Sequence, residues 1–316
     1  MTETYVSFSL IAVYSAMAIY ALAFIAFTVD LARRAAPEPV AIDAPAIDVP
    51  GAVTVATAVA PPVTTTSKAS RFMRTAMALT VIGFVSHTAS IVLRGLAAGY
   101  APWSNMFGFA LTATALIVGV FLLVQLWQEI RFLGVYVIGF ALVFLGVGTV
   151  NFYVDVVPLP PALQSIWLVI HVFVAILGTA FFALGAGLSL AQLLQSRREQ
   201  SGKGFRFLAT LPSSERLENS AYRVILIGFV FWTFTLIAGA VWAERAWGRY
   251  WGWDTKEVWT FIIWTLYAGY IHARATRGWR GARSAYLAII GFAAVLFNFT
   301  IVNLFFKGLH SYSGLK

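Results

Sequence analysis

The feature that most constrains this chain is a series of apolar runs, each about long enough to cross a bilayer as a helix. Hydrophobic residues make up 60% of the 316 residues and charged residues 11%, where a soluble domain has roughly a quarter charged. A soluble protein of this size has no interior that hides so much apolar surface, so soluble classes are excluded. We predict an all-α polytopic membrane protein with about eight transmembrane helices, at approximately 5–29, 72–94, 106–127, 132–153, 164–195, 221–244, 257–276 and 283–306.

The basic residues lie at the ends of these runs, so the net charge of +9 is a topology signal and not a nucleic-acid-binding surface. With the N-terminus outside, 16 of the 22 Lys and Arg residues fall in inside segments and 6 in outside segments. Both termini are therefore predicted on the outer, extracytoplasmic side. Arg33 and Arg34 follow the first run, which favours an uncleaved anchor over a signal peptide.

Three parts are expected along the chain: a first transmembrane helix at 1–34, a linker at 35–70 and a seven-helix domain at 71–316. Residues 35–70 contain six of the 11 prolines, and no helix tolerates that density. We predict a disordered cytoplasmic linker, with a binding tail as the alternative. No internal repeat is visible, which disfavours an inverted-repeat solute carrier.

Ionisable side chains in membrane spans are costly and are candidates for function. The chain has four histidines and no cysteine, so thiolate metal sites are excluded. In the predicted topology, His171 and His310 face the outer compartment, whereas His272 lies near the inner end of the seventh run. His87 lies within the second run, where a packed polar residue is the favoured interpretation.

A tryptophan cluster lies between the sixth and seventh runs, where residues 241–259 read VWAERAWGRYWGWDTKEVW and contain 5 of the 11 tryptophans. An interfacial aromatic belt explains one or two at a helix end, but not five. Large aromatic side chains suit stacking against a flat apolar ligand. Two outer histidines beside them would supply axial nitrogens to an iron, so the pattern predicts a porphyrin platform on the outer face.

The stretch WGRYWGWDTKEVW resembles the WWD signature of haem-handling membrane proteins. From about residue 100 to its end the chain resembles the CcsA/ResC family, the integral-membrane half of the System II cytochrome c maturation machinery. Supporting stretches are PLPPALQSIWLVIHV at 158–172, GAVWAERAW at 239–247 and VNLFFKGLHSYSG at 302–314. One departure is Gly108 in APWSNMFG, which stands where family members often carry a Glu.

The resemblance implies a haem site without a catalytic residue of this chain's own. It implies that His171 and His310 ligate the haem iron at the outer face. It also implies that His272 belongs to an inner haem site, opposite a histidine of a partner. The expected haem-binding set further includes the loop residues Trp247, Tyr250, Trp251, Trp253 and Asp254.

Each charged residue around this loop has two possible roles. Asp254 is expected to orient the loop, with pairing to Lys256 as the alternative. Arg245 and Arg249 are equally well interpreted as partners of haem propionates or as anchors at lipid headgroups.

The implied function is to move haem b outward as a bound substrate and to present it to apocytochrome c for thioether attachment at Cys-x-x-Cys-His. The implied partners are a CcsB/ResB-like membrane protein, apocytochrome c and a thiol-reducing thioredoxin-like protein. The chain is then the haem-presenting subunit of a cytochrome c synthase complex, in a bacterial plasma membrane or a thylakoid membrane. The alternatives are a haem exporter without ligase activity and a b-type haem electron-transfer subunit.

Overall fold

The computed structural model describes residues 2–35, 70–276, 278–306 and 308–310. Every regular element in these ranges is a helix, as predicted for an all-α chain. Most of the predicted linker at 35–70 lies outside the described residues.

The helices begin and end close to the predicted apolar runs. The long helices are α1 (Thr2–Arg34), α2 (Arg71–Ala98), α3 (Met106–Val124), α4 (Gly134–Asn151), α5 (Ile166–Ser201), α6 (Ser214–Trp247), α7 (Thr255–Thr276) and α8 (Ala282–Phe297). The short ones are the 3-10 turns η1 (Arg131–Leu133), η2 (Pro161–Leu163) and η3 (Arg206–Thr210), the π turn η4 (Asn298–Val302) and α9 (Asn303–Phe305).

Seven helical segments in the described part of the chain are long and apolar enough to cross a membrane. They are α1, α2, α3, α4 with η1, α5, α6, and α8 continued through η4 and α9. The chain is therefore an integral membrane protein. The predicted run at 257–276 is the 22-residue helix α7, which is not among the seven.

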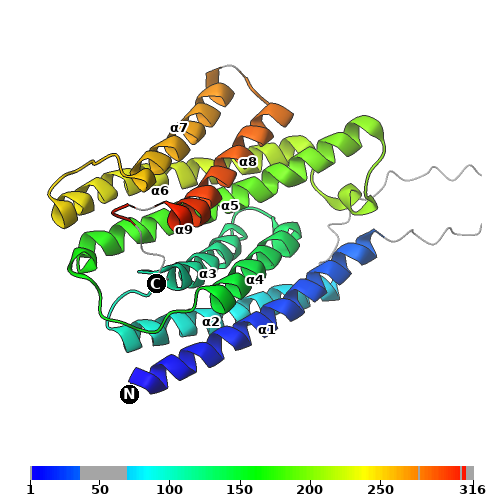
Figure 1. The fold of residues 1–316 in the computed structure, drawn as a ribbon. Helices are drawn as coiled ribbons and strands as arrows, with labels where there is room; N and C mark the ends of the chain where they lie inside the picture. The colour runs from blue at the N-terminus through cyan, green and yellow to red at the C-terminus, as the bar shows by residue number, and fades with distance from the viewer. Residues whose placement is uncertain (1, 36–69, 277, 307, 311–316) are drawn as a thin grey trace, which may run out of the picture.

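The bundle is organised around α5, which packs against α3, α4, α6 and α8. Figure 1 shows α1 and α2 as an antiparallel pair along one side and α7 and α8 along the other, with α3 and α4 between them. The start of α1 and the α6–α7 connection lie at one end of the bundle, which we call the loop end (Figure 1).

Close packing of α5 against α6 depends on small residues at their contact. A Cβ on Gly178 would lie 3.3 Å from the carbonyl oxygen of Gly228, and one on Gly185 would overlap the side chain of Ile225. In lipid, helices associate mainly through such close contacts, because the surrounding acyl chains are as apolar as the side chains. These glycines therefore set the spacing of the two longest helices.

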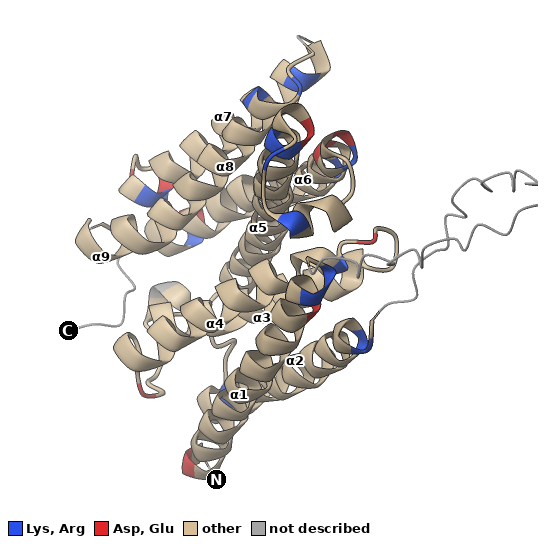
Figure 2. Cartoon of the chain, turned by 90° about the vertical axis from the view of Figure 1, so that its right-hand side faces the viewer, with Lys and Arg blue, Asp and Glu red and all other residues tan. Residues whose placement is uncertain are grey.

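The end of the bundle opposite the loop end is tied by an ion pair between buried side chains. Nη1 of Arg274 lies 2.5 Å from Oε1 of Glu218, and Oε2 of Glu218 accepts the N–H of Gly281 at 2.9 Å. The pair joins α6 to α7 and to the turn before α8. Figure 2 shows that Lys and Arg gather at this same end, where α1 ends and α2 begins.

His87 lies in the interface between α1 and α2. Its side chain is buried, and its ring lies edge-on to that of Tyr20 with the ring centroids 5.9 Å apart. Its Nδ1 lies 3.4 Å from the Tyr20 hydroxyl. Ser9 and Ser90 form a second polar contact across the same interface. This setting matches the interpretation of His87 as a packed polar residue.

Replacing Gly185 by Leu should destabilise the protein, because the added side chain overlaps Ile225. Overpacking of this kind costs roughly 1–3 kcal/mol, so the midpoint of thermal unfolding in detergent should fall. Gly269→Ala on α7 is the matched control, because a Cβ there meets no atom within 4 Å. The Gly185→Leu/Ile225→Ala double variant should recover part of the loss. An unchanged midpoint in Gly185→Leu would contradict this account of the α5–α6 contact.

Candidate functional site

A large pocket lies at the loop end of the bundle, among α3, α5, α6, α7 and α8. It encloses about 1550 Å³ of empty space, its open mouth included. Four of the predicted site residues line it: His171, His310, Tyr250 and Trp251. The structure therefore brings together two histidines that are 139 positions apart in the sequence.

The α6–α7 loop along this pocket is held by its own backbone. α6 ends at Gly248, whose φ of 69° is a left-handed conformation that glycine adopts without strain. Trp253 has a φ of 58°, which is uncommon for a bulky residue. The loop thus adopts a specific conformation that its composition does not reveal.

A capping arrangement at the start of α7 fixes the end of this loop. Oε2 of Glu257 accepts the N–H groups of Gly252 at 2.8 Å and of Asp254 at 3.0 Å. Oδ2 of Asp254 accepts the N–H of Lys256 at 3.3 Å. This reciprocal pattern is similar to a capping box, but the Asp254 side chain accepts from the second helical residue and not from the third. Both carboxylates of the WDTKE stretch are therefore used to begin α7.

His310 is held in place by Asp254. Its Nδ1 donates to Oδ2 of Asp254 at 2.7 Å, and Oδ1 of the same carboxylate accepts the N–H of Leu309 at 2.9 Å. Burial acts to raise the pKa of the Asp254 carboxyl, but the hydrogen bond and charge of His310 and the N–H groups of Leu309 and Lys256 hold that pKa below its usual value. Asp254 therefore accepts from His310 as a carboxylate.

His171 is held by a different kind of acceptor. It lies near the start of α5, and its Nδ1 donates to the carbonyl oxygen of Thr235 on α6 at 3.0 Å. Trp242 stacks on its ring at a centroid distance of 5.8 Å and an interplanar angle of 16°. Gly239 faces the ring so closely that a Cβ there would lie 2.7 Å from Cε1 of the imidazole. The ring thus has a single position, set by α6.

Both imidazoles leave the same atom free. Each uses Nδ1 in a hydrogen bond, and no described residue hydrogen-bonds to Nε2 of either ring. An imidazole whose Nδ1–H is donated carries its lone pair on Nε2, which is the form that ligates metals. Trp242 contacts both rings, since the His310 centroid lies 5.4 Å from it. The arrangement therefore offers two metal-binding nitrogens in one pocket.

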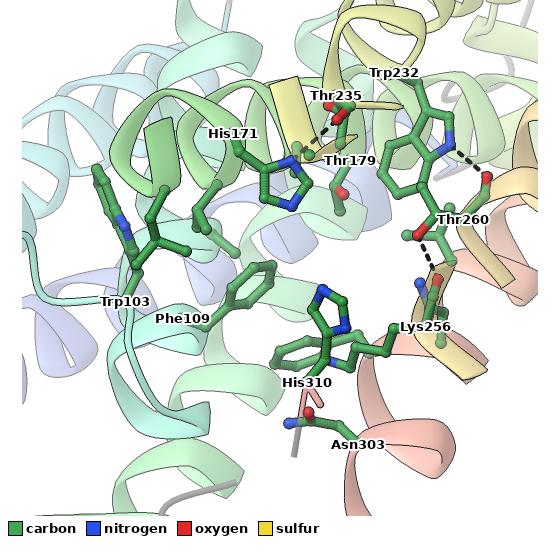
Figure 3. A pocket seen from close by; sticks show the side chains of 18 of the residues that line it. Trp103, Phe109, His171, Thr179, Trp232, Thr235, Lys256, Thr260, Asn303 and His310 are labelled. Atoms are coloured by element: carbon green, nitrogen blue, oxygen red, sulfur yellow. Dashed lines mark hydrogen bonds between the residues drawn. The ribbon is translucent and has the colours of Figure 1, made fainter. Parts of the chain in front are cut away.

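The pocket walls are largely apolar and include several aromatic side chains. Trp103 and Phe109 approach from one side (Figure 3), and Phe109 stacks on Phe299 at 4.4 Å. One π turn, η4, places Asn298 and Asn303, five residues apart, so that both line the pocket. Such walls suit a flat, largely apolar ligand that carries a metal.

Four of the predicted residues lie outside the pocket lining. Trp247 packs edge-on against His310 with the ring centroids 4.8 Å apart. Asp254 does not line the pocket itself but hydrogen-bonds to His310, which does. The side chain of Trp253 is 78% exposed. His272 is exposed on α7, about 24 Å along the helix axis from Lys256 at 1.5 Å per residue.

The charged residues around the loop separate into two groups. Arg245 and Arg249 are exposed and do not line the pocket, whereas Lys256 does. Asp254 accepts the backbone N–H of Lys256, and its negative charge also acts favourably on the Lys256 ammonium, but no ion pair within 4.0 Å joins the two side chains in the described residues.

Sequence reasoning missed several pocket residues. Trp103 stands in the WSN stretch before α3, and Gly239 and Trp242 stand in the GAVWAERAW stretch of α6. Both stretches predicted which segments form the site, but not which of their side chains face the pocket. Asn298 and Asn303 carried no signal, because positions five apart in a regular α-helix point about 140° away from each other around the axis.

Known proteins share both the sequence and the fold of this chain. The family model described as "Cytochrome C assembly protein" matches residues 103–310. A "Cytochrome c biogenesis protein CcsA" from Synechococcus sp. (strain CC9902) is 36% identical over 260 residues, covering 71% of this chain and 82% of that protein. The protein of the same name from Guillardia theta is 35% identical over 255 residues, covering 75% and 85%.

A solved structure titled "Cytochrome c Heme Lyase CcmF" has a similar fold. It superposes with a TM-score of 0.64 at 18% sequence identity, and the match covers 93% of this chain and 46% of that one. This chain thus spans about half the length of that lyase, and the likeness concerns the fold alone. With the family match over the whole pocket region and the sequence identity to its relatives, the chain belongs to the CcsA family of cytochrome c biogenesis proteins.

Proposed function

We propose that this chain carries haem outward across the membrane and presents it at the loop-end pocket to apocytochrome c. The observation that carries the proposal is that His171 and His310 line one largely apolar pocket, and that no described residue hydrogen-bonds to Nε2 of either ring. Haem is the substrate that matches this combination, because it is flat, apolar on its faces and able to take two axial nitrogens.

In this proposal the two histidines bind the iron from opposite sides. Bis-histidine ligation fills both axial positions and so limits side reactions of the iron. The remaining residues orient these ligands: Thr235 and Gly239 fix the His171 ring, and Asp254 fixes the His310 ring. The histidine of the Cys-x-x-Cys-His segment then replaces one of the two ligands, and the bound haem holds its vinyl groups beside the thiols as a proximity effect.

The inner site is proposed around His272. Its exposed position on α7 favours a ligand completed by another subunit, for which a CcsB/ResB-like protein with an opposing histidine is the proposed partner. The gathering of Lys and Arg at the end opposite the loop supports an orientation with that end in the cytoplasm (Figure 2). In that orientation α7 is an eighth crossing and both termini lie outside.

The proposed setting is a cytochrome c synthase complex in the plasma membrane of a bacterium or in a thylakoid membrane, supported by the CcsA relatives from Synechococcus and Guillardia theta. The chain presents haem b, while apocytochrome c, kept reduced by a thioredoxin-like protein, supplies the thiols. Co-expression with the partner and an apocytochrome should yield covalently bound haem. Haem that reaches the outer face but forms no thioether with a Cys-x-x-Cys-His peptide would favour an exporter instead.

Replacing either outer histidine should abolish the low-spin haem spectrum. His171→Ala and His310→Ala each remove one axial nitrogen, and added imidazole should restore the spectrum by filling the vacancy. The absorption spectrum of purified, haem-loaded protein is the measurement. His87→Gln is the control, because His87 lies between α1 and α2, outside the pocket. Full haem and full cytochrome c maturation in both alanine variants would rule out this ligand pair.

Replacing Asp254 by Asn should weaken the haem site without removing a ligand. The carboxylate makes His310 a stronger donor, so its loss should lower haem affinity roughly 10-fold or more and raise the reduction potential of the bound iron. A redox titration followed by absorbance measures both effects. Asp155→Asn, an exposed carboxylate outside this pocket, should change neither. An unaltered potential in Asp254→Asn would show that Asp254 does not act through His310.

His272→Ala should leave little haem at either site if haem enters from the cytoplasm. His310→Ala should instead allow haem to arrive but bind it poorly at the outer site. Haem content per purified protein, measured for both variants, separates the two cases. Thr276→Ala, exposed at the same end of α7, is the control. Wild-type haem at the outer site of His272→Ala would favour lateral entry from the membrane.

A further inference from the structure

Lys256 is a cation on the pocket wall without a carboxylate partner. It is the second residue of α7 and half-buried, and its side chain points into the pocket on the side of His310 and Asn303 (Figure 3). Among the described residues no carboxylate oxygen lies within 4.0 Å of its ammonium. The charge of Asp254 compensates this cation in part, but the ammonium lacks the direct ion pair that buried charges normally have.

The two carboxylates nearest in sequence already have other partners. Asp254 accepts from His310, from Leu309 and from the backbone of Lys256, and Oε2 of Glu257 accepts two backbone N–H groups of the loop. Oε1 of Glu257 has no hydrogen-bond partner in the described structure, and Asp254 acts on the ammonium through its charge, but neither carboxylate forms an ion pair with Lys256 within 4.0 Å. The positive charge of Lys256 is therefore left for something that enters the pocket.

Two amides also line the pocket. Asn298 and Asn303 line the same pocket, and the Oδ1 atom of each is buried without a hydrogen-bond partner in the described structure. An amide offers both a donor and an acceptor. Lys256 and the two amides are polar groups in a largely apolar pocket, which Glu257 and several Thr residues also line. A few polar groups of this kind fix the orientation of a bound ligand.

We propose that Lys256, assisted by Asn303, binds a propionate of haem in the outer pocket. This inference rests on the proposed function and assigns a residue for the carboxylate end of that substrate. Hydrogen bonds between an ammonium and a carboxylate are stronger than those between neutral groups. Each of the two charges would also neutralise the other in the pocket. The role falls to Lys256 rather than to Arg245 or Arg249, because both arginines are exposed outside the pocket.

Binding of haem and of haem dimethyl ester tests the assignment directly. The ester keeps the ring and the iron but lacks both carboxylates. Purified protein in detergent is titrated with each compound, and the Soret absorbance reports affinity and ligation state. Lys256→Met should weaken haem binding roughly tenfold and leave ester binding unchanged. Lys256→Arg should retain most of the affinity for haem, since it keeps the charge.

The controls separate this assignment from the proposed function. Arg245→Met, on the exposed last turn of α6, should change neither affinity. If haem gives a bis-histidine spectrum in the unmodified protein and Lys256→Met loses no affinity, the propionate assignment is overturned and the haem site stands. If Lys256→Met weakens haem and ester equally, Lys256 only shapes the wall and the assignment is overturned. If neither compound gives that spectrum in the unmodified protein, both proposals fail.

A lipid phosphate presents similar chemistry to a lysine at the membrane surface. Adding phosphatidylglycerol to the titration distinguishes this source. If the lipid competes with the ester in the unmodified protein but not in Lys256→Met, the site belongs to a headgroup and the assignment is overturned. Haem affinity that depends on Lys256 and is insensitive to the lipid supports the propionate.

Discussion

The hydrogen bond between Asp254 and His310 is the contact on which the rest of the site depends. It joins two parts of the chain that are 56 positions apart, the start of α7 and the segment after α9. The same carboxylate caps α7 and accepts from Leu309, so one side chain orders the loop, the helix start and the histidine together. Loss of that charge would therefore weaken contacts to all three at once, while Glu257 still holds the loop through the N–H groups of Gly252 and Asp254.

The helices were largely predictable from sequence, and the reason is physical. Each apolar run is about as long as the bilayer is thick, and backbone groups in lipid must be satisfied within the helix. The runs predicted at 106–127 and 257–276 correspond to α3 and α7 within a few residues. α7 differs in composition because it carries both Lys256 at one end and His272 and Arg274 at the other, so hydropathy alone does not select it.

The site was predictable only in part. The placement of His171 and His310 in one pocket follows from the resemblance and the topology, because both lie at the loop end. The direction of Trp253 does not follow, since it depends on a left-handed backbone conformation that nothing in WGWD specifies. The same holds for Asn298 and Asn303, which share the pocket through a π turn. Residue types were visible in the sequence, whereas the sides they face were set by local backbone geometry.

The two histidines differ in how firmly the surrounding structure holds their rings. His171 belongs to a 36-residue helix at the centre of the bundle, and Gly239 and Trp242 leave its ring no second position. His310 lies beyond the last helix and is tethered by one carboxylate and the edges of two indoles. The His171 side of the pocket is therefore held by the centre of the bundle, whereas the His310 side is held by a few side-chain contacts. A rearrangement that opens the pocket would disrupt fewer contacts on the side of His310.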